Sequence, residues 1–372
     1  MHCIAFTGGG TGGHIYPGLA VAFFIQKKFP CRIIWIGANA GMDKAIVESA
    51  GIVFFGIPSG KLRRYFSFKN VSDVFRIVSG FFAARRILKR EGAELLFSKG
   101  GFVSVPPCAA AKFLKIPVFT HESDFSPGLA TRINTRFAEK IFIPYQESAS
   151  FYPPRVSERV FVSGNPIRQD FDVADPAQGR EFLGLGQGER ILLVLGGSLG
   201  SREINTLVRS CLSELIRNYT VVHQTGEING VALGASFGDS PNRYKPYDYF
   251  RGEISHIIAA AELVLCRSGA GTIWECKKLN KPMVLVPFRG SGTRGDQVEN
   301  ARLFENAGAA ICFTEEGPEA PSKLASLINS LAADAGKQKA MGKAKIAKAD
   351  AAAYIAKEII TKVKEISVNA DN

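Results

Sequence analysis

The amino-acid sequence predicts an α/β protein with two doubly wound domains, each built on a parallel β-sheet covered by helices. Three observations predict this fold class. A chain of 372 residues is long for one hydrophobic core and usual for two. Short apolar runs alternate with helical stretches, which is typical of strands buried on both faces of a sheet. A strand, a glycine loop and a helix follow one another near the N-terminus, and the same order recurs from Arg190.

The strands are expected at the apolar runs. In the first half these cover residues 3–7, 32–37, 95–100, 116–121, 139–144 and 159–162. The turn residues 164–166 then predict a hinge, and the pattern restarts with strands at residues 190–195, 219–224, 261–266 and 281–288. We therefore place one domain at residues 1–163 and the other at residues 164–349. A last helix is expected at about residues 350–366, with one apolar stripe for packing on a domain, formed by Ile355, Ile359, Val363 and Ile366.

Composition and charge exclude several classes of protein. No apolar run reaches the roughly 18 residues that a membrane-spanning helix needs, and no leader pattern precedes the first strand, so we expect a cytoplasmic chain. The seven cysteines form no Cys-x-x-Cys pair, which predicts reduced thiols and no zinc site. The net charge of +12 favours anionic partners, unless it reflects only a solvated basic surface. No nucleic-acid-binding motif is visible, so we expect no nucleic-acid partner.

The first glycine loop, "GGGTGGH" at residues 8–14, permits three interpretations. Its spacing matches a dinucleotide fingerprint, but the second strand ends in residues 37–39 without the acid that would bind a ribose. A P-loop is excluded because His14 and Ile15 stand where lysine and serine or threonine are needed. The third interpretation is a loop that approaches an anionic ligand closely and presents His14 at a helix start as a general base. A purely structural histidine that caps the turn is the alternative.

Two later loops carry candidate chemistry. "GGSLG" at residues 196–200 fits the nucleophile elbow of a serine hydrolase with Ser198 as nucleophile, and it equally fits a helix start that binds a diphosphate. "CRSGAGTIWE" at residues 266–275 opens another helix, where Glu275 could bind ribose hydroxyls or simply interact favourably with the helix dipole. Asp170 and Asp172 resemble a metal-binding Asp-x-Asp pair, but they follow no strand and are interpreted as solvated.

The set of loops resembles the MurG family of bacterial glycosyltransferases. "GGGTGGHIYPGLA", "SKGGFVS", "GNPIR", "GGSLGS", "CRSGAGTIWE" and "DQVENA" occur in that family's order and spacing, from residue 3 to about residue 365. The resemblance implies a GT-B fold, in which two Rossmann-like domains face a cleft and a C-terminal helix returns to the first domain. It implies an inverting, metal-independent transfer of N-acetylglucosamine from UDP-N-acetylglucosamine to undecaprenyl-pyrophosphoryl-muramyl-pentapeptide, a step of cell-wall peptidoglycan synthesis, without any cofactor.

The resemblance also implies roles for individual residues. His14 would be the base, with Glu122 as the second candidate. The first domain would hold the acceptor and the second would hold the nucleotide sugar. Substrate would be bound by Thr11, Gly12, Gly13, Asp124, Arg168, Ser198, Phe250, Arg251, Ala270, Gly271, Thr272, Ile273, Trp274, Glu275 and Gln297.

Within that set, the resemblance assigns contacts to parts of the nucleotide sugar. Ser198 and residues 270–275 would hold the diphosphate and the ribose, with Glu275 on the ribose. The backbone at Phe250 and Arg251 would meet the uracil. Arg168 would lie beside the nucleotide sugar, and Gln297 would meet the sugar hydroxyls.

Two positions depart from the family pattern. The family usually has His-Glu-Gln-Asn where this chain has residues 121–124, so Asp124 replaces an asparagine and cannot donate hydrogen bonds. Asp296 precedes Gln297, where the family often has histidine or glutamine. The alternatives that stay open are a related GT-B enzyme with another acceptor, such as a glycolipid synthase, a UDP-sugar 2-epimerase, a serine hydrolase and a non-catalytic nucleotide-sugar binder.

The basic stretch at residues 61–90 predicts a helix from about Asp73 whose apolar arc is wider than packing on one sheet requires. One explanation is a helix buried on two sides. The other is docking on the cytoplasmic face of the plasma membrane, where Phe75 and Phe82 enter the leaflet and Arg85 and Arg86 meet anionic headgroups. Because the implied acceptor is membrane-anchored, we expect a peripheral membrane protein.

Overall fold

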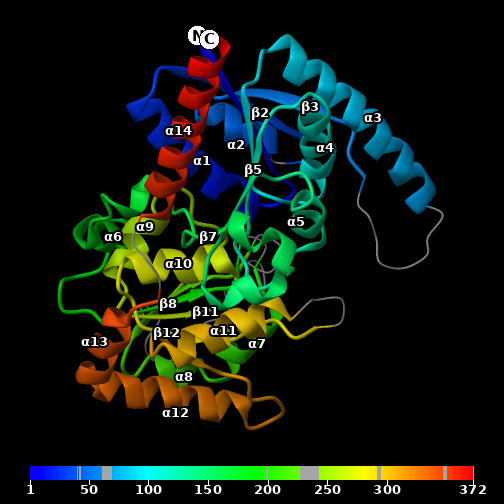
Figure 1. The fold of residues 1–372 in the computed structure, drawn as a ribbon. Helices are drawn as coiled ribbons and strands as arrows, with labels where there is room; N and C mark the ends of the chain where they lie inside the picture. The colour runs from blue at the N-terminus through cyan, green and yellow to red at the C-terminus, as the bar shows by residue number, and fades with distance from the viewer. Residues whose placement is uncertain are drawn as a thin grey trace. The chain divides into compact units, whose positions relative to one another are not determined.

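The computed structural model describes residues 1–39, 41, 43–60, 69–197, 200–226, 243–290, 295–346 and 350–371. The chain divides into two compact units, Met1–Arg168 with Ala347–Asn372, and Gln169–Ile346. Each unit has its own parallel sheet with helices around it (Figure 1). The predicted fold class is therefore confirmed. The division falls after Arg168, whereas the sequence analysis placed it after Ser163.

In the first unit, the described residues form a seven-stranded parallel sheet in the order β3-β2-β1-β4-β5-β6-β7. The strands are β1 His2–Thr7, β2 Cys31–Ala38, β3 Val53–Ile57, β4 Leu95–Ser98, β5 Val118–His121, β6 Lys140–Ile143 and β7 Val160–Val162. The helices are α1 Gly12–Lys28, α2 Asp43–Ser49, α3 Lys69–Arg90, α4 Val105–Phe113, α5 Leu129–Asn134 and α14 Ala351–Asp371, with 3-10 turns η1 Phe102–Ser104, η2 Glu147–Phe151 and η3 Pro154–Arg159.

The two faces of this sheet carry separate hydrophobic cores. One core packs the sheet against α3 and α4, through buried residues such as Leu88 and Cys108. The other packs it against α1 and α14, through residues such as Ile25 and Ile359. Strands β4 and β5 are buried along their whole length. Coverage of both faces explains why these strands read as continuous apolar runs in the sequence.

In the second unit, the described residues form a six-stranded parallel sheet in the order β10-β9-β8-β11-β12-β13. The strands are β8 Ile191–Leu195, β9 Thr220–Gln224, β10 Tyr244–Tyr247, β11 Leu263–Cys266, β12 Met283–Leu285 and β13 Ala310–Cys312. The helices are α6 Pro176–Leu183, α7 Arg202–Ser210, α8 Leu212–Leu215, α9 Ile254–Ala260, α10 Ala270–Lys278, α11 Asp296–Asn306, α12 Ala320–Ala333 and α13 Ala335–Lys343, with η4 Gln169–Phe171 before them.

Local sequence signals set several helix ends in this unit. Asp175 caps α6 by accepting from the N–H of Ala177, and Gly184 ends the helix in the left-handed conformation. Ser201 caps α7 by accepting from the N–H of Ile204. These residues satisfy backbone groups that have no partner inside the helix, so they fix where α6 and α7 begin or end.

The expected strands were found at every predicted run, and three further strands were not predicted. β3 contains Gly56, β10 contains Pro246, and β13 has three residues. Proline removes a ladder donor and glycine weakens strand propensity. These strands form because they pair with β2, β9 and β12.

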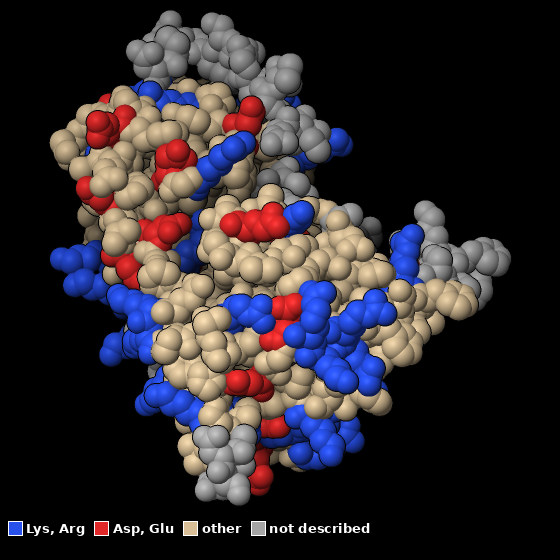
Figure 2. All heavy atoms as spheres, turned by 90° about the horizontal axis from the view of Figure 1, so that it is seen from above, with Lys and Arg blue, Asp and Glu red and all other residues tan. Residues whose placement is uncertain are grey.

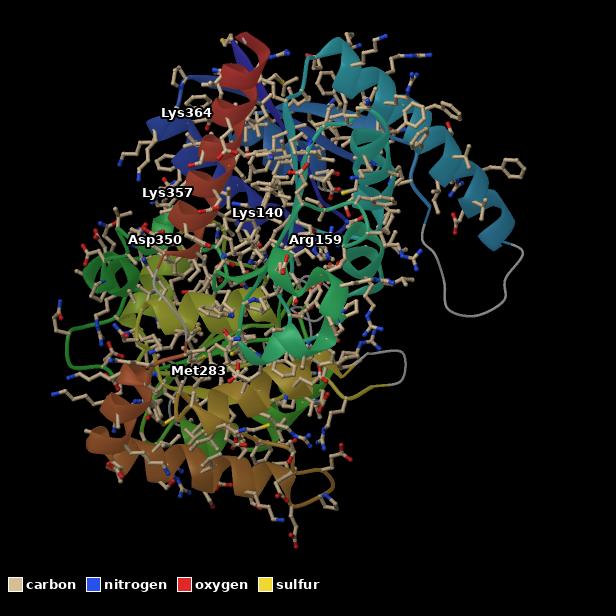
Figure 3. All side chains as sticks on the ribbon, in the orientation of Figure 1. Lys140, Arg159, Met283, Asp350, Lys357 and Lys364 are labelled. Atoms are coloured by element: carbon tan, nitrogen blue, oxygen red, sulfur yellow. The ribbon has the colours of Figure 1, made fainter. Side chains whose placement is uncertain are left out.

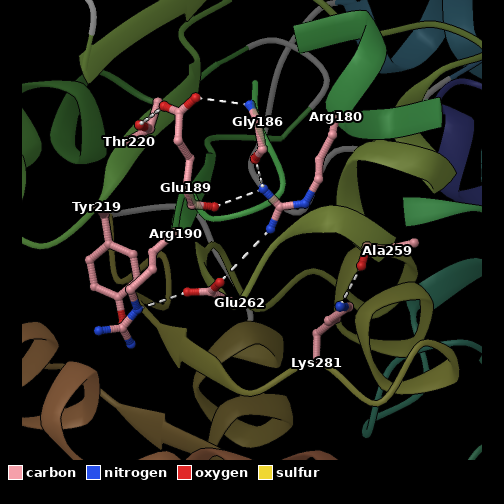
Figure 4. Close-up of polar contacts among 9 residues, drawn as sticks. All are labelled: Arg180, Gly186, Glu189, Arg190, Tyr219, Thr220, Ala259, Glu262 and Lys281. Carbon is pink, nitrogen blue, oxygen red and sulfur yellow. Dashed lines mark hydrogen bonds and ion pairs between the residues drawn. The ribbon is translucent and has the colours of Figure 1, made fainter. Parts of the chain in front are cut away.

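A charged network ties the N-terminal ends of the second sheet together (Figure 4). Glu262, just before β11, lies 2.9 Å from Nε of Arg190 and 3.9 Å from Arg180. Arg180 donates to the backbone carbonyls of Gly186 and Glu189. Because these groups are paired at the end of the sheet where parallel strands begin, they stabilise the fold and leave the opposite end for ligands.

The C-terminal helix α14 packs on the first unit, as its apolar stripe predicts. Ile355, Ile359 and Val363 are fully buried, whereas Ile366 is only partly buried. Lys140 of β6 donates to the carboxylate of Glu358 on α14, and Figure 3 shows Lys140 beside this helix, which also carries Lys357 and Lys364. Burial of three branched side chains contributes several kcal/mol, so this helix is part of the first core.

We predict that Ile359→Ala destabilises the first unit by about 2–5 kcal/mol, because it leaves a cavity in the core beneath α14. The free energy of unfolding from urea titration measures the change. Val368→Ala on the same helix is the matched control, because Val368 is 61% exposed. Equal small losses for both variants would show that α14 does not contribute to this core.

Candidate active site

The first glycine loop joins β1 to α1, and Asp43 of α2 fixes its backbone. The N–H of Gly10 lies 3.1 Å from both carboxylate oxygens of Asp43, which is buried. A Cβ atom at Gly9 would lie 1.9 Å from the same carboxylate. The acid that the sequence places past the second strand therefore binds the loop itself. This contact explains why the dinucleotide fingerprint is incomplete here.

His14 lies in the first turn of α1, half-buried, and the next loop holds its ring. Nδ1 lies 3.1 Å from the backbone carbonyl oxygen of Lys99. Because a carbonyl oxygen can only accept, Nδ1 carries the hydrogen and the neutral ring keeps its lone pair on Nε2. A general base needs this tautomer, since Nε2 can then take a proton from a substrate hydroxyl.

The loop after β4 approaches the first glycine loop so closely that side chains are excluded. Gly100 and Gly101 have φ of 82° and 78°, in the left-handed region. A Cβ atom at Gly101 would lie 2.5 Å from the carbonyl oxygen of Gly9, and one at Gly100 would lie 3.7 Å from Nδ1 of His14. Two backbones therefore enclose the imidazole, and only glycine fits between them.

Glu122 follows β5 and is buried, and its carboxylate organises the loop that comes after it. One oxygen accepts from the N–H groups of Ser123 and Asp124 at 2.8 and 3.2 Å, and the other accepts from Gly128 at 3.0 Å. Although burial raises its pKa, the Lys99 ammonium and these hydrogen bonds outweigh burial and hold the pKa of Glu122 below its usual range.

Lys99 is a buried cation that the sequence analysis did not single out. Its Nζ donates to the Ser123 hydroxyl at 2.6 Å, and that hydroxyl donates to Asn165 Oδ1 at 2.8 Å. Burial lowers the pKa of Lys99 to about 8, against the opposing effect of the carboxylates of Glu122 and Asp124. The available signal was a lysine directly after the apolar strand residues 95–98, at the position where the strand enters its loop.

The other predicted residues of the first unit lie at the same end of the sheet. Thr11 is the N-cap residue of α1, and residues 11–13 are exposed or partly exposed. Asp124 is half-buried in the loop after β5. The guanidinium of Arg168 lies 4.6 Å from the centre of the Tyr16 ring on α1. These residues therefore lie after strands of the first sheet or at the start of α1, and Arg168 reaches α1 through Tyr16.

In the second unit, the glycine loop between β8 and α7 is held by Gln224. Ser198 lies outside the described residues, whereas Gly196, Gly197 and Gly200 are described. The amide of Gln224 donates to the carbonyl of Gly197 at 3.1 Å, and its oxygen accepts from the N–H of Phe250 at 3.0 Å. Gln224 thus joins the loop to the segment expected near uracil, although the sequence analysis did not select it.

In the segment expected to bind uracil, the backbone N–H groups donate hydrogen bonds to other residues of the protein. The N–H of Phe250 donates to Gln224, and the N–H of Arg251 lies 3.2 Å from a carboxylate oxygen of Glu253. Phe250 is buried and its ring centre lies 4.7 Å from that of Tyr247. Phe250 therefore positions this segment through its packed ring.

The helix α10 begins at the carboxyl end of β11. Ala270 is its first residue, and the N-cap Gly269 provides no side-chain hydrogen bond to the helix start. Ile273 and Trp274 are buried, so their side chains belong to the core. Thr272 and Glu275 are partly exposed. Backbone N–H groups at such a helix start favour an anion such as a diphosphate.

The start of α11 is tied to the loop that precedes α10. The Ser268 hydroxyl donates to the backbone carbonyl of Gln297 at 2.6 Å. The amide of Asn300 donates to the carbonyl of Ser268 at 3.1 Å. The side-chain oxygen of Gln297 accepts from the N–H of Phe288 at 3.0 Å. Gln297 therefore lies next to the α10 start.

A Ser198 hydrolase would need a histidine downstream of the serine, and the two candidates, His223 and His256, both have other partners. His223 is buried, its ring nitrogens lie 3.1 Å from Asn205 and 3.2 Å from the Tyr244 hydroxyl, and burial lowers its pKa to about 4. His256 accepts at Nδ1 from the N–H of Asp175 at 3.0 Å. Both contacts argue against the charge-paired histidine that activates a serine nucleophile.

One of the two acids after the hinge, Asp172, pairs with a lysine. Asp172 lies 2.6 Å from Lys278 of α10. Across the described ranges, no group of three or more histidine, cysteine, aspartate or glutamate side chains could hold a metal ion. The Asp170 and Asp172 pair therefore provides no observation in favour of a metal site.

Two family models match the chain. Residues 4–143 match the glycosyltransferase family 28 N-terminal domain, and residues 191–359 match the glycosyltransferase family 28 C-terminal domain. The chain belongs to glycosyltransferase family 28. The first match lies within the first unit, and the second begins at β8 and extends into α14.

Two similar proteins carry the same name. The chain is 48% identical over 325 residues to the UDP-N-acetylglucosamine–N-acetylmuramyl-(pentapeptide) pyrophosphoryl-undecaprenol N-acetylglucosamine transferase of Treponema denticola, covering 83% of each chain. It is 40% identical to a transferase of the same name, numbered 2, from Bacillus cereus, covering 85% of this chain and 88% of that one. These names confirm the resemblance inferred from the loops.

Solved structures agree on the fold. The MurG structure from Acinetobacter baumannii superposes with a TM-score of 0.73 at 23% identity, covering 97% of this chain and all of that one. A UDP-GlcNAc 2-epimerase from Neisseria meningitidis, bound to UDP-GlcNAc, reaches 0.69 at 13% identity, covering 98% of this chain and 100% of the other. At these identities the likeness shows a common fold, the two-domain GT-B architecture that family 28 also uses.

We predict that Gly101→Ala destabilises the protein more than Gly92→Ala does. Both glycines have left-handed φ, so both variants carry backbone strain of about 1–2 kcal/mol. At Gly101 the new Cβ also meets the Gly9 carbonyl, whereas nothing lies within 4 Å at Gly92. Urea unfolding of the two variants provides the comparison, and equal losses would show that the two loops separate without cost.

Proposed function

We propose that this chain transfers N-acetylglucosamine from UDP-N-acetylglucosamine to undecaprenyl-pyrophosphoryl-muramyl-pentapeptide, in the synthesis of cell-wall peptidoglycan. The observation that carries the proposal is the identity of 40–48% over more than four fifths of the chain to transferases of that name. The site supports it because a histidine with an oriented ring lies in one unit, and the other unit has a helix start whose N-cap glycine has no side chain to cap it.

In the proposed reaction, the acceptor hydroxyl attacks the anomeric carbon from the face opposite UDP. The new carbon–oxygen bond forms as the bond to the UDP oxygen breaks, which inverts the anomeric configuration. Nε2 of His14 takes the hydroxyl proton. Backbone N–H groups at the start of α10, together with Ser198 and Arg168, stabilise the charge that grows on the diphosphate, so the proposed transfer requires neither a metal nor a cofactor.

We assign the base to His14 and a positioning role to Glu122. The Glu122 carboxylate accepts from three backbone N–H groups and has a lowered pKa, so it is a weak proton acceptor. His14 instead has the tautomer that leaves Nε2 as the acceptor. Residues 11–13 would lie against both substrates, and Asp124 would accept a hydrogen bond from a sugar hydroxyl where the family asparagine could also donate.

The nucleotide is proposed to bind the second unit. Glu275 would accept from two ribose hydroxyls, Ala270 to Thr272 would bind the diphosphate, and Gln297 would reach the sugar. Phe250 and Arg251 would frame the uracil. Ile273 and Trp274 would contribute only through their backbone, because their side chains are buried.

The direct experiment supplies purified protein with labelled UDP-N-acetylglucosamine and the lipid-linked muramyl-pentapeptide. We expect a labelled lipid-linked disaccharide and UDP, with activity preserved in EDTA. Conversion of UDP-N-acetylglucosamine to its 2-epimer without acceptor would instead identify an epimerase. Transfer to a diacylglycerol but not to the muramyl lipid would identify a glycolipid synthase.

We predict that His14→Ala lowers turnover by about 10²–10⁴-fold while UDP binding changes little, because the acceptor hydroxyl loses its base. His2→Ala is the control, since His2 lies at the beginning of β1 and pairs with Glu94. Turnover and calorimetric UDP affinity are the two measurements. Near-normal turnover of His14→Ala would assign the base elsewhere.

We predict that Glu275→Ala weakens UDP binding by about tenfold or more, because a charged acceptor for the ribose is lost. Glu319→Ala is matched to it, since Glu319 is the N-cap residue of α12 and is exposed. Calorimetry gives affinity and thermal unfolding gives stability. Unchanged UDP affinity with lowered thermal stability would mean that Glu275 stabilises its own helix and does not bind the ribose.

We also propose that α3 docks the protein on an anionic membrane surface, the cytoplasmic face of the plasma membrane. Four apolar side chains on one side of α3 are 49–72% exposed, namely Val74, Phe75, Val78 and Phe82. The interpretation of α3 as a helix buried on two sides is therefore wrong, because only its other side, with residues such as Leu88, packs in the core. Across the described ranges, no helix is long and apolar enough to span a bilayer.

Basic side chains and one more exposed aromatic ring lie beside the exposed side of α3. Phe113 of α4 is 65% exposed, and its ring centre lies 6.0 Å from that of Phe81 on α3 and 5.2 Å from the guanidinium of Arg85. Arg86 and Lys89 are exposed on α3. Lys and Arg side chains also gather in several groups on the face drawn in Figure 2. Exposed aromatics with basic neighbours match an interfacial helix bound to anionic lipid.

We predict that changing Phe75 and Phe82 to serine reduces co-sedimentation with both anionic and neutral liposomes. Changing Arg85 and Arg86 to glutamine should weaken binding to anionic liposomes alone, by roughly 30-fold if each cation contributes about 1 kcal/mol. Both variants should keep their UDP affinity. Val173→Ser, at a residue that is 73% exposed in the second unit, is the control. Unchanged sedimentation would place the docking surface elsewhere.

A further inference from the structure

Lys99 is the most deeply buried cation in the described part of the first unit, with 1% of its surface exposed. Removing a lysine ammonium from water is costly unless partners compensate it. Its partners here are the Ser123 hydroxyl at 2.6 Å and the carboxylates of Glu122 and Asp124. Such an arrangement needs a reason beyond packing, because an apolar side chain of similar volume would avoid the cost of desolvation.

The same residue contacts the proposed base through its backbone. The carbonyl oxygen of Lys99 accepts from Nδ1 of His14, while its Nζ donates to Ser123. Ser123 in turn donates to Asn165 after β7. One residue therefore connects the helix start that carries His14 with the loop that carries Asp124. Lys99, Ser123 and Asn165 are buried, so the connection between the ammonium and the loop is fixed from inside the unit.

The charges that face this ammonium come from several elements. Glu122 and Asp124 belong to the loop after β5, and both act on Lys99. His121 at the end of β5 is held neutral, because burial and the Lys99 charge lower its pKa well below its usual value. His14 of α1 contacts the Lys99 backbone carbonyl, and Asn165 accepts from the Ser123 hydroxyl that the ammonium contacts. The two carboxylates are thus the groups whose position depends on the ammonium charge.

We propose that Lys99 is a positioning residue whose ammonium charge holds the 122–128 loop, beside the His14 ring that its backbone carbonyl holds, in the arrangement that accepts the lipid-linked substrate. This inference rests on the proposed function and adds a residue to it. Loss of the charge would weaken the hydrogen bond to the Ser123 hydroxyl and leave Glu122 and Asp124 as neighbouring like charges, which repel. A shift of about 1 Å in a reacting group costs on the order of 10²-fold in rate.

The proposal has a pH signature. Because the pKa of Lys99 is lowered to about 8, kcat/KM for the acceptor should fall as pH rises through about 8. Stability should change in the opposite direction. Between about 8 and the unperturbed 10.5, the unfolded chain binds more protons than the folded one at this lysine, so the free energy of unfolding gains a contribution as pH rises. Activity would therefore be lost without unfolding.

Two variants test this signature. Lys99→Arg keeps a charge that does not titrate, so the alkaline fall in kcat/KM should disappear. Ser123→Ala removes a hydrogen bond to the charged form, so the fall should move to lower pH.

A third variant tests the size of the effect: Lys99→Met should lower acceptor kcat/KM by about 10²-fold while leaving UDP affinity unchanged. Lys28→Met, at an exposed residue ending α1, is the matched control.

The outcomes separate the two proposals. Transfer by the wild-type protein that is flat between pH 7 and 9.5 overturns the role of Lys99 and leaves the proposed function intact. The same holds if folded Lys99→Arg and Ser123→Ala keep the wild-type alkaline fall. If the Lys99 variants do not fold, the pH profiles of the wild-type protein and of Ser123→Ala decide whether Lys99 has this role. Absence of transfer by the wild-type protein at any pH overturns the proposed function and this inference with it.

Discussion

The candidate site of the first unit depends on the close approach of two loop backbones, at Gly9 and Gly101. A Cβ atom at Gly101 would lie 2.5 Å from the Gly9 carbonyl, so the contact exists only between glycines. It places the Lys99 carbonyl on the His14 ring, which selects the tautomer. Asp43 fixes the first loop from the other side, through the N–H of Gly10. The geometry of the candidate site in this unit is therefore set by main-chain packing.

Both sheets separate the groups that stabilise the fold from the groups with candidate chemistry. In the second unit, Glu262 and its arginine partners lie where the strands begin, and they are paired. The glycine loop and the α10 start lie where the strands end, and helix N–H groups there favour anions. A parallel sheet produces this division, because every strand ends at the same edge. Because of this division, the loops at one edge can change, and with them the substrate, while the fold is kept.

The sequence predicted the strands that are continuously apolar, because burial on both faces leaves a pattern within a few residues. It also located His14 and the α10 start, since glycine loops after strands are local features. It could not predict β10 or the roles of Lys99 and Gln224. Pro246 disfavours a strand at β10, and the strand forms only because it pairs with β9. Lys99 and Gln224 act through partners distant in sequence, and although the lysine directly after strand residues 95–98 was visible, its partners were not.

Helices α3 and α14 are both amphipathic and rich in lysine or arginine, yet they differ in what covers them. α14 buries Ile355, Ile359 and Val363 against the sheet, whereas α3 leaves Phe75 and Phe82 more than 60% exposed. Exposure of two phenylalanine side chains forgoes about 3–6 kcal/mol of burial. The core beneath α3 is already filled by Leu88 and its neighbours. Beyond the contact of the Phe82 ring with Phe81, the exposed side therefore adds little burial to the fold, and the proposed docking role would account for its apolar character.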